Sequence, residues 1–130
     1  MAKILRDLWI LTESGTTICS RVIDPRVNPQ IFGALMSALN TFAENLSEGG
    51  ISNFELRNIR FSIIKKNHFL FVANSPNKIK VKKVQNELNN ISEKFFSLYP
   101  EEMLKKWDSD VGIFDSFISS IKNSLNNDIK

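Results

Sequence analysis

The chain is poor in the residues that most often build metal and redox centres. Among its 130 residues Cys19 is the only cysteine and His68 the only histidine. One cysteine cannot form an intramolecular disulfide, and two soft ligands are too few for a structural zinc site, which uses four. We therefore expect no disulfide framework, no metal site and no cofactor.

Long apolar runs and low-complexity segments are also missing. No run approaches the roughly 18 apolar residues of a membrane-spanning helix, and Asp7 stands where a signal peptide carries its apolar stretch. Glycine and proline together occupy nine positions, as in an ordered globular protein. Hydrophobic residues make up 42% of the chain, which is enough for one core. The sequence predicts a single cytoplasmic domain, residues 1–130, with its core at about 4–125 and a polar tail at 126–130.

Signatures of catalysis are absent as well. The chain has no Gly-rich phosphate loop, no G-x-S-x-G elbow and no H-E-x-x-H motif. Asp108 and Asp110 begin a segment like a calcium loop, but Ile113 and Ser119 replace the required glycine and glutamate. We interpret the two acids as helix caps and expect neither calcium binding nor catalytic residues.

His68 and Cys19 also have ordinary interpretations. His68 stands at a basic corner with no carboxylate near it in the sequence, which favours a solvated turn residue. Cys19 lies on an expected strand without a companion histidine, which favours a small packing residue. We therefore expect this protein not to be an enzyme.

Acidic residues are absent from the segment 57–83, which holds eight basic ones. The rest of the chain has nine basic and fourteen acidic residues, so the net charge of +3 combines +8 here with −5 elsewhere. Anionic lipid, an acidic protein surface and an ordinary solvated face are the alternatives. Nucleic acid is disfavoured because the nearby aromatics alternate with apolar residues and are expected to be buried. The candidate basic face comprises Lys65, Lys66, Lys78, Lys80, Lys82 and Lys83.

The first half of the chain predicts a hairpin followed by a helix. An apolar run at 8–11 and a β-branched stretch at 16–22 indicate two paired strands, the first covered on both faces. Asn28 followed by Pro29 is typical of a helix start, and Gly49-Gly50 of a helix end, which predicts a helix over about 29–47. Its apolar residues form one stripe: Ile31, Leu35, Ala38, Leu39, Phe42 and Leu46.

The second half predicts three strands and then helices. Apolar residues alternate from 51 to 74, and the first of the three strands is short enough to be a sheet edge. A turn is expected at 74–77. Apolar steps of three and four residues then predict an amphipathic helix from about 81 to Pro100. A further helical turn begins at Glu101, and a last helix runs from Ile113 to Leu125.

This order of elements, and the aromatic residues near the end of the chain, resemble the longin domain. One helix ends with Phe95, Phe96 and Tyr99, and after a spacer the last helix carries Phe117. The pattern is similar to longin SNAREs and to the small sigma subunits of clathrin adaptors, over about residues 4–125. The resemblance implies an α+β, longin/profilin-like fold in the order β-β-α-β-β-β-α-α. Its five-stranded antiparallel sheet would carry one helix on one face and two on the other.

The resemblance also implies recognition rather than catalysis. Longin domains bind a partner segment between the first helix and the third strand, where an open strand edge also allows β-addition. They pair with small GTPases, longin or roadblock proteins, or adaptor subunits. The implied role is a non-catalytic interaction module in vesicle-trafficking-like processes, with a homodimer or peripheral contact with anionic membrane as further options. The candidate partner groove comprises Met36, Phe42, Ile51, Phe54 and Leu56, which would otherwise fill the core.

Two departures from these relatives refine the expectation. Roadblock domains, which scaffold or regulate small GTPases as dimers, share the sheet but usually lack a second C-terminal helix. The pattern from Ile113 to Leu125 therefore favours longin over roadblock. With neither a heptad segment nor a cysteine box after residue 125, we expect neither fusion-SNARE activity nor prenylation.

Overall fold

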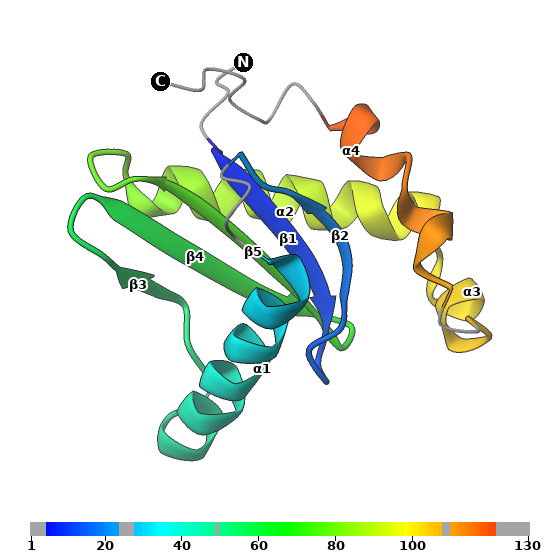
Figure 1. The fold of residues 1–130 in the computed structure, drawn as a ribbon, viewed down its shortest axis with the longest axis horizontal. Helices are drawn as coiled ribbons and strands as arrows, with labels where there is room; N and C mark the ends of the chain where they lie inside the picture. The colour runs from blue at the N-terminus through cyan, green and yellow to red at the C-terminus, as the bar shows by residue number, and fades with distance from the viewer. Residues whose placement is uncertain (1–4, 24–27, 49, 108–109, 122–130) are drawn as a thin grey trace.

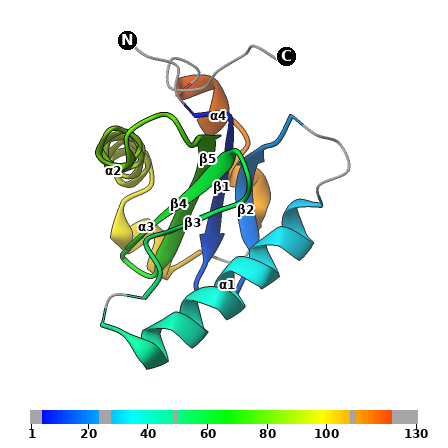
Figure 2. The same cartoon turned by 90° about the vertical axis from the view of Figure 1, so that its left-hand side faces the viewer.

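The computed structural model describes residues 5–23, 28–48, 50–107 and 110–121. Five strands form one antiparallel sheet in the order β2-β1-β5-β4-β3. Helix α1 covers one face of this sheet, while α2 and the C-terminal elements cover the other (Figures 1 and 2). The expected α+β fold with a five-stranded antiparallel sheet is confirmed.

The strands follow the apolar patterns of the sequence. Strand β1 lies inside the sheet between β2 and β5. It is apolar on both faces because Leu8 and Ile10 belong to one core, and Trp9 and Leu11 to the core on the opposite face. At the other side of the sheet β3 is the short edge that the sequence predicts. The strands are β1 (Asp7–Thr12), β2 (Thr17–Arg21), β3 (Asn53–Glu55), β4 (Ile59–Lys66) and β5 (Phe69–Pro76).

The two long helices match their predicted positions. Helix α1 (Pro29–Leu46) begins where the Asn28 side chain accepts hydrogen bonds from Gln30 N at 2.9 Å and Ile31 N at 3.2 Å. Helix α2 (Val81–Leu98) ends just before Pro100, and α3 (Glu101–Lys105) is the short helical turn expected there. No helix among the described residues is both long and apolar enough to cross a membrane.

The expected turn at 74–77 begins later than the sequence predicts. Strand β5 continues to Pro76, and Asn74 is buried inside the sheet. Its side-chain oxygen accepts from Asp7 N at 2.8 Å, and its amide nitrogen donates to Asp7 Oδ2 at 3.0 Å. Because a partner 67 residues away satisfies the Asn74 amide, this polar residue can remain in the strand.

The last helix differs from the prediction. Instead of a continuous helix from Ile113, the chain forms a 3-10 turn, η1 (Val111–Phe114), and one helical turn, α4 (Phe117–Ser120). The 3-10 turn starts at Asp110, whose side chain accepts from Gly112 N at 2.9 Å, so Asp110 is the cap that the sequence predicts. Residues 108–109, which include the other expected cap Asp108, and residues 122–130, which include Leu125, lie outside the described residues.

Each face of the sheet carries its own core. On the α2 face Phe95 is the centre of an aromatic cluster that includes Phe71, Phe114 and Phe117, all buried. The short C-terminal elements thus cover the sheet with two phenylalanines. On the α1 face the core is smaller, and its buried residues are Trp9, Leu11, Met36, Phe61, Ile63, Leu70 and Val72.

Candidate protein-docking surface

Helix α1 packs on the sheet with only one side. Met36 is buried, and Phe32 stacks on Trp9 with ring centroids 4.0 Å apart. Leu39 is half-buried against the same cluster. Because 3.6 residues make one turn, these positions share one side of the helix. Most of the stripe that the sequence predicts therefore lies elsewhere on α1.

That stripe is exposed on a flank of α1. Ile31 is 70% exposed, Leu35 53%, Phe42 63% and Leu46 73%. Their spacing of four, seven and four residues keeps them on one flank, next to half-buried Leu39. We call Ile31, Leu35, Phe42 and Leu46 the apolar stripe. Contiguous apolar surface of this kind marks an interaction site more often than scattered single residues do.

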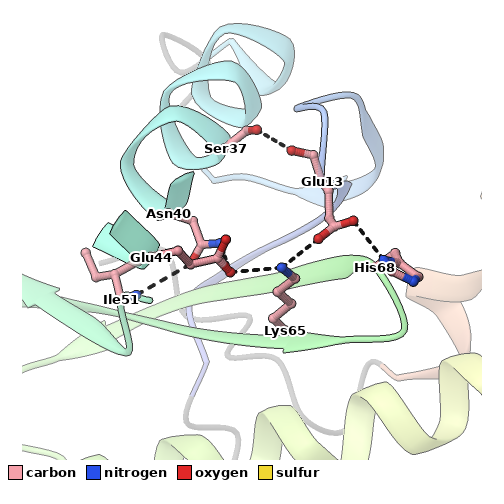
Figure 3. Close-up of polar contacts among 7 residues, drawn as sticks. All are labelled: Glu13, Ser37, Asn40, Glu44, Ile51, Lys65 and His68. Carbon is pink, nitrogen blue, oxygen red and sulfur yellow. Dashed lines mark hydrogen bonds and ion pairs between the residues drawn. The ribbon is translucent and has the colours of Figure 1, made fainter. Parts of the chain in front are cut away.

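The opposite flank of α1 is fixed to the sheet by polar and close contacts. Gly33 packs so closely on Gly15 that an added Cβ would lie 2.7 Å from the Gly15 carbonyl oxygen. The Ser37 hydroxyl donates to the backbone carbonyl of Glu13 (Figure 3). Both contacts reach the turn between β1 and β2. Since this flank faces the β1–β2 turn, the apolar stripe lies on the flank of α1 away from that turn.

A charged network continues the same flank toward the C-terminal end of α1 (Figure 3). Lys65 Nζ lies 2.6 Å from Glu13 Oε2 and 2.8 Å from Glu44 Oε2. His68 Nδ1, in the β4–β5 turn, lies 2.8 Å from the other Glu13 oxygen. Asn40 donates to Glu44 at 3.1 Å. The network joins α1, β4 and two turns that are distant in the sequence.

The electrostatics of this network follow from its hydrogen bonds. The hydrogen bond from Lys65, followed by that from His68, lowers the pKa of Glu13. The bonds from Lys65 and Asn40 lower the pKa of Glu44. In return, Glu13 and then Glu44 raise the pKa of Lys65. All three groups are therefore charged near neutral pH, which fits a structural clamp and not a proton-transferring site.

The two edges of the sheet differ in their protection. On β2 the Gln30 side chain accepts from Thr17 N at 3.0 Å and donates to Thr17 O at 2.9 Å. It thus occupies both backbone groups of an edge residue, as a neighbouring strand would. Such covering is a common way to prevent unwanted strand pairing. No corresponding side chain covers β3 among the described residues.

Strand β3 leaves backbone groups open. Ser52 O accepts from β4 at 2.9 Å, and Leu56 N donates to β4 at 2.8 Å. Because antiparallel bonding alternates along a strand, the N–H and C=O groups of Asn53 and Glu55 point away from β4. These groups can pair with an added strand. We call the apolar stripe and this edge together the docking surface.

The structure separates the five residues of the predicted groove. Met36 lies in the core under α1, so it cannot line an open groove. Phe54 is half-buried because it stacks on Phe61, with centroids 4.8 Å apart, and Ile51 packs against the same core. Phe42 and Leu56 are exposed. Ile31, Leu35 and Leu46 belong to this surface but were absent from the predicted groove, although their spacing is visible in the sequence.

The candidate basic face is likewise divided. Lys65 and Lys66 lie at the end of β4 that joins β5, whereas Lys78, Lys80, Lys82 and Lys83 lie beyond the opposite end. At about 3.3 Å per residue the length of β4 separates the groups by roughly 20 Å. Lys65 is also held by two carboxylates. Because an eight-residue strand intervenes, the six lysines do not form one face.

His68 and Cys19 are the remaining residues that the sequence singled out as possible reactive groups. His68 is 81% exposed in a tight turn, as expected. Cys19 is buried, which raises the pKa of its thiol to about 12. No group of three potential metal ligands exists in the part of the chain that the structure describes.

Comparison with known proteins gives matches of fold alone. No family model and no curated protein sequence matches the chain. MglB of Myxococcus xanthus aligns with a TM-score of 0.55 at 13% identity, over 72% of this chain and 85% of MglB. The roadblock/LC7 domain of Streptomyces avermitilis aligns with a TM-score of 0.56 at 12% identity, over 72% and 87%. The chain has the fold of roadblock/LC7 domains.

The finer choice between longin and roadblock stays a prediction. The sequence favours longin because of a second C-terminal helix, but the described residues hold only the short η1 and α4 in that region. The matching structures are roadblock/LC7 and MglB proteins. Because longin and roadblock domains share this sheet, the structural match fits the fold that the longin resemblance implies.

Proposed function

We propose that this chain is a non-catalytic protein-interaction module that binds and regulates a small GTPase. The class of partner follows from the resemblance to longin and roadblock domains, which pair with small GTPases. The observations that support the proposal are the exposed apolar stripe on α1 and the open backbone groups of the edge strand β3. The vesicle-trafficking and adaptor roles that the resemblance also implies remain predictions.

The docking surface combines two modes of recognition. Four large apolar side chains, each more than half exposed, can pack against an apolar patch of a partner. The backbone groups of Asn53 and Glu55 can pair with an edge strand of the same partner. The clamp at Lys65 holds α1 in place before binding. A preformed surface of this kind lowers the entropic cost of association.

The test is direct binding of purified small GTPases from the source organism, loaded with GDP or with a non-hydrolysable GTP analogue. We expect a GTPase to bind, and Leu35→Asp and Phe42→Asp to weaken binding about thirtyfold, the effect of losing one hot spot of ~2 kcal/mol. Leu98→Asp is the matched control, because Leu98 is 50% exposed on α2 across the sheet. Binding that the stripe variants leave unchanged would contradict the proposed surface.

A second copy of the chain is the alternative occupant. Two β3 edges related by a two-fold axis would pair antiparallel and place the two apolar stripes on the same side of the joined sheets. Light scattering of the wild-type protein and of Leu35→Asp measures this directly. If no GTPase binds and only the stripe variants are monomeric, the surface serves self-association and the GTPase proposal fails.

A further inference from the structure

One end of the sheet carries five exposed cations, which come from three separate segments. The β3–β4 turn supplies Arg57, the β5–α2 connection supplies Lys78 and Lys80, and the first turn of α2 supplies Lys82 and Lys83. Figure 1 shows the β3–β4 turn and the start of α2 at the same end of the molecule. We call these five residues the basic end. They lie beyond the end of β4 opposite to Lys65.

Hydrogen bonds hold the segments of the basic end together. Asn77 Nδ2 donates to Arg57 O at 3.2 Å, and Asn77 N donates to Asn58 O at 3.2 Å. The buried guanidinium of Arg60 donates to Asn77 O at 2.9 Å and to Ile79 O. Lys78 stands between Asn77 and Ile79 in the chain, and Lys80 follows Ile79. Both lysines therefore adjoin a carbonyl that Arg60 of β4 holds in place. The arrangement of the cations is built into the fold.

The carboxylate of Glu55, which lies on β3 just before Leu56 and Arg57, does not neutralise the basic end. Glu55 Oε2 lies 3.2 Å from Arg60 Nε, so its charge is matched by the buried arginine. None of the five cations forms an ion pair in the part of the chain that the structure describes, whereas Lys65 contacts two carboxylates. Lysines at the start of α2 also oppose the helix dipole, and that turn contains no acid. Fold stability therefore does not explain them.

An exposed apolar residue accompanies the charges. Leu56 is 57% exposed and precedes Arg57 in the β3–β4 turn. An apolar side chain beside several lysines suits a lipid surface, where the former enters the acyl boundary and the latter meet anionic headgroups. Nucleic acid is less suitable, because the exposed large hydrophobic residues include one aromatic, Phe42, and it lies on α1.

We infer that the basic end binds the surface of anionic phospholipid membranes, with Leu56 at the lipid interface. The inference is independent of the proposed GTPase partner, because it uses neither the apolar stripe nor the backbone edge of β3. The basic end and the apolar stripe share no residue. The module could then hold a protein partner at a membrane through two separate surfaces.

The test is co-flotation of the full chain with phosphatidylcholine vesicles that contain or lack phosphatidylserine, at physiological and at high salt. The variant Lys80→Glu, Lys82→Glu, Lys83→Glu is compared with Lys66→Glu, Lys105→Glu, Lys106→Glu, which changes the net charge equally at other exposed or half-exposed sites. We expect salt-sensitive binding that requires phosphatidylserine. Each lysine contributes about fivefold, so the first variant lowers partitioning by about a hundredfold or more and the second far less.

Two further variants separate the explanations. Leu56→Ser should weaken binding about tenfold without changing any charge. Leu35→Asp should float like the wild type, which distinguishes this inference from the proposed docking surface. The triple lysine variant should stay folded, because acidic side chains in the first turn of α2 interact favourably with the helix dipole. Circular dichroism checks that it is folded. Absence of flotation, equal loss in both triple variants, or binding only to acidic peptides or oligonucleotides would overturn the inference.

Discussion

Lys65 Nζ lies 2.6 Å from a carboxylate oxygen of Glu13, a residue 52 positions earlier in the chain. The same ammonium group lies 2.8 Å from Glu44 on α1. One cation thus connects a helix, a strand and a turn that no local pattern relates. The direction in which α1 presents its apolar stripe depends on this clamp and on the close packing of Gly33.

Replacement of Lys65 by Met should lower the melting temperature by about 2 °C, since partly exposed ion pairs stabilise little. Lys65 lowers the pKa of Glu13 and Glu44 below 4.5. The contribution of the clamp is therefore present above pH 4.5 and is lost as the pH falls through the lowered pKa values. Thermal unfolding across this range should show wild type and variant converging in acid. Lys66→Met is the control, and a difference independent of pH would argue against the clamp.

Gly33→Ala tests how closely α1 packs on the sheet. The new Cβ would lie 2.7 Å from Gly15 O and would also clash with Thr17 Oγ1, and the Gly15 carbonyl cannot move aside without shifting the β1–β2 turn. We expect a loss of about 1–3 kcal/mol in the free energy of unfolding, although alanine favours helix by ~1 kcal/mol. Urea unfolding measures this against Asn45→Ala, at an exposed position of α1. A variant as stable as that control would contradict the close contact.

Arg60→Met removes the buried cation that fixes the β5–α2 connection. The carbonyls of Asn77 and Ile79 lose their donors, and Glu55 loses its partner. We expect a loss of about 2–4 kcal/mol by urea unfolding, because buried polar groups are left unpaired. Arg57→Met, at an exposed position, should stay within ~0.5 kcal/mol of the wild type. Equal effects of the two substitutions would show that Arg60 does not hold this connection.

Cys19 offers a chemical measure of the core. Burial, with a smaller effect of Asp115, raises the pKa of its thiol to about 12. At pH 8 the thiol is protonated and covered, so iodoacetamide should modify the native protein orders of magnitude more slowly than the denatured chain. Mass spectrometry of the single adduct measures both rates. Rapid labelling of the folded protein would mean that the strand β2 is not packed as described.

Much of the fold could be predicted because its signals are local. The N-cap at Asn28, the alternation along β4 and β5, and the three- and four-residue steps of α2 each depend on neighbours within a few positions. The continuation of β5 to Pro76 could not be predicted in this way. It depends on Asp7, which satisfies Asn74 only once β1 and β5 are paired.

The candidate site was predicted less completely. The longin resemblance implies a docking region between the first helix and the third strand. The structure exposes Phe42 on α1 and leaves β3 as an open edge, while the region itself stays a prediction. The predicted groove also includes Met36, which the structure buries. The basic segment is continuous in sequence, but the chain reverses direction between β4 and β5. Lys65 therefore lies at one end of this strand pair and Lys80 follows the opposite end. Spatial clusters of charge depend on this reversal and not on nearness along the chain.

The amino-acid sequence alone determined the type and order of the strands and long helices, because backbone preferences and apolar periodicity act over a few residues. Only the tertiary structure decided which side of α1 is buried. Apolar residues occupy two sides of this helix, one with Phe32 and Met36 and the other with Leu35 and Phe42, and periodicity cannot choose between them. The choice is made by distant contacts, with Gly33 against Gly15 and Lys65 between Glu13 and Glu44. Those contacts exist only when the sheet has formed, and they leave the second apolar side in solvent.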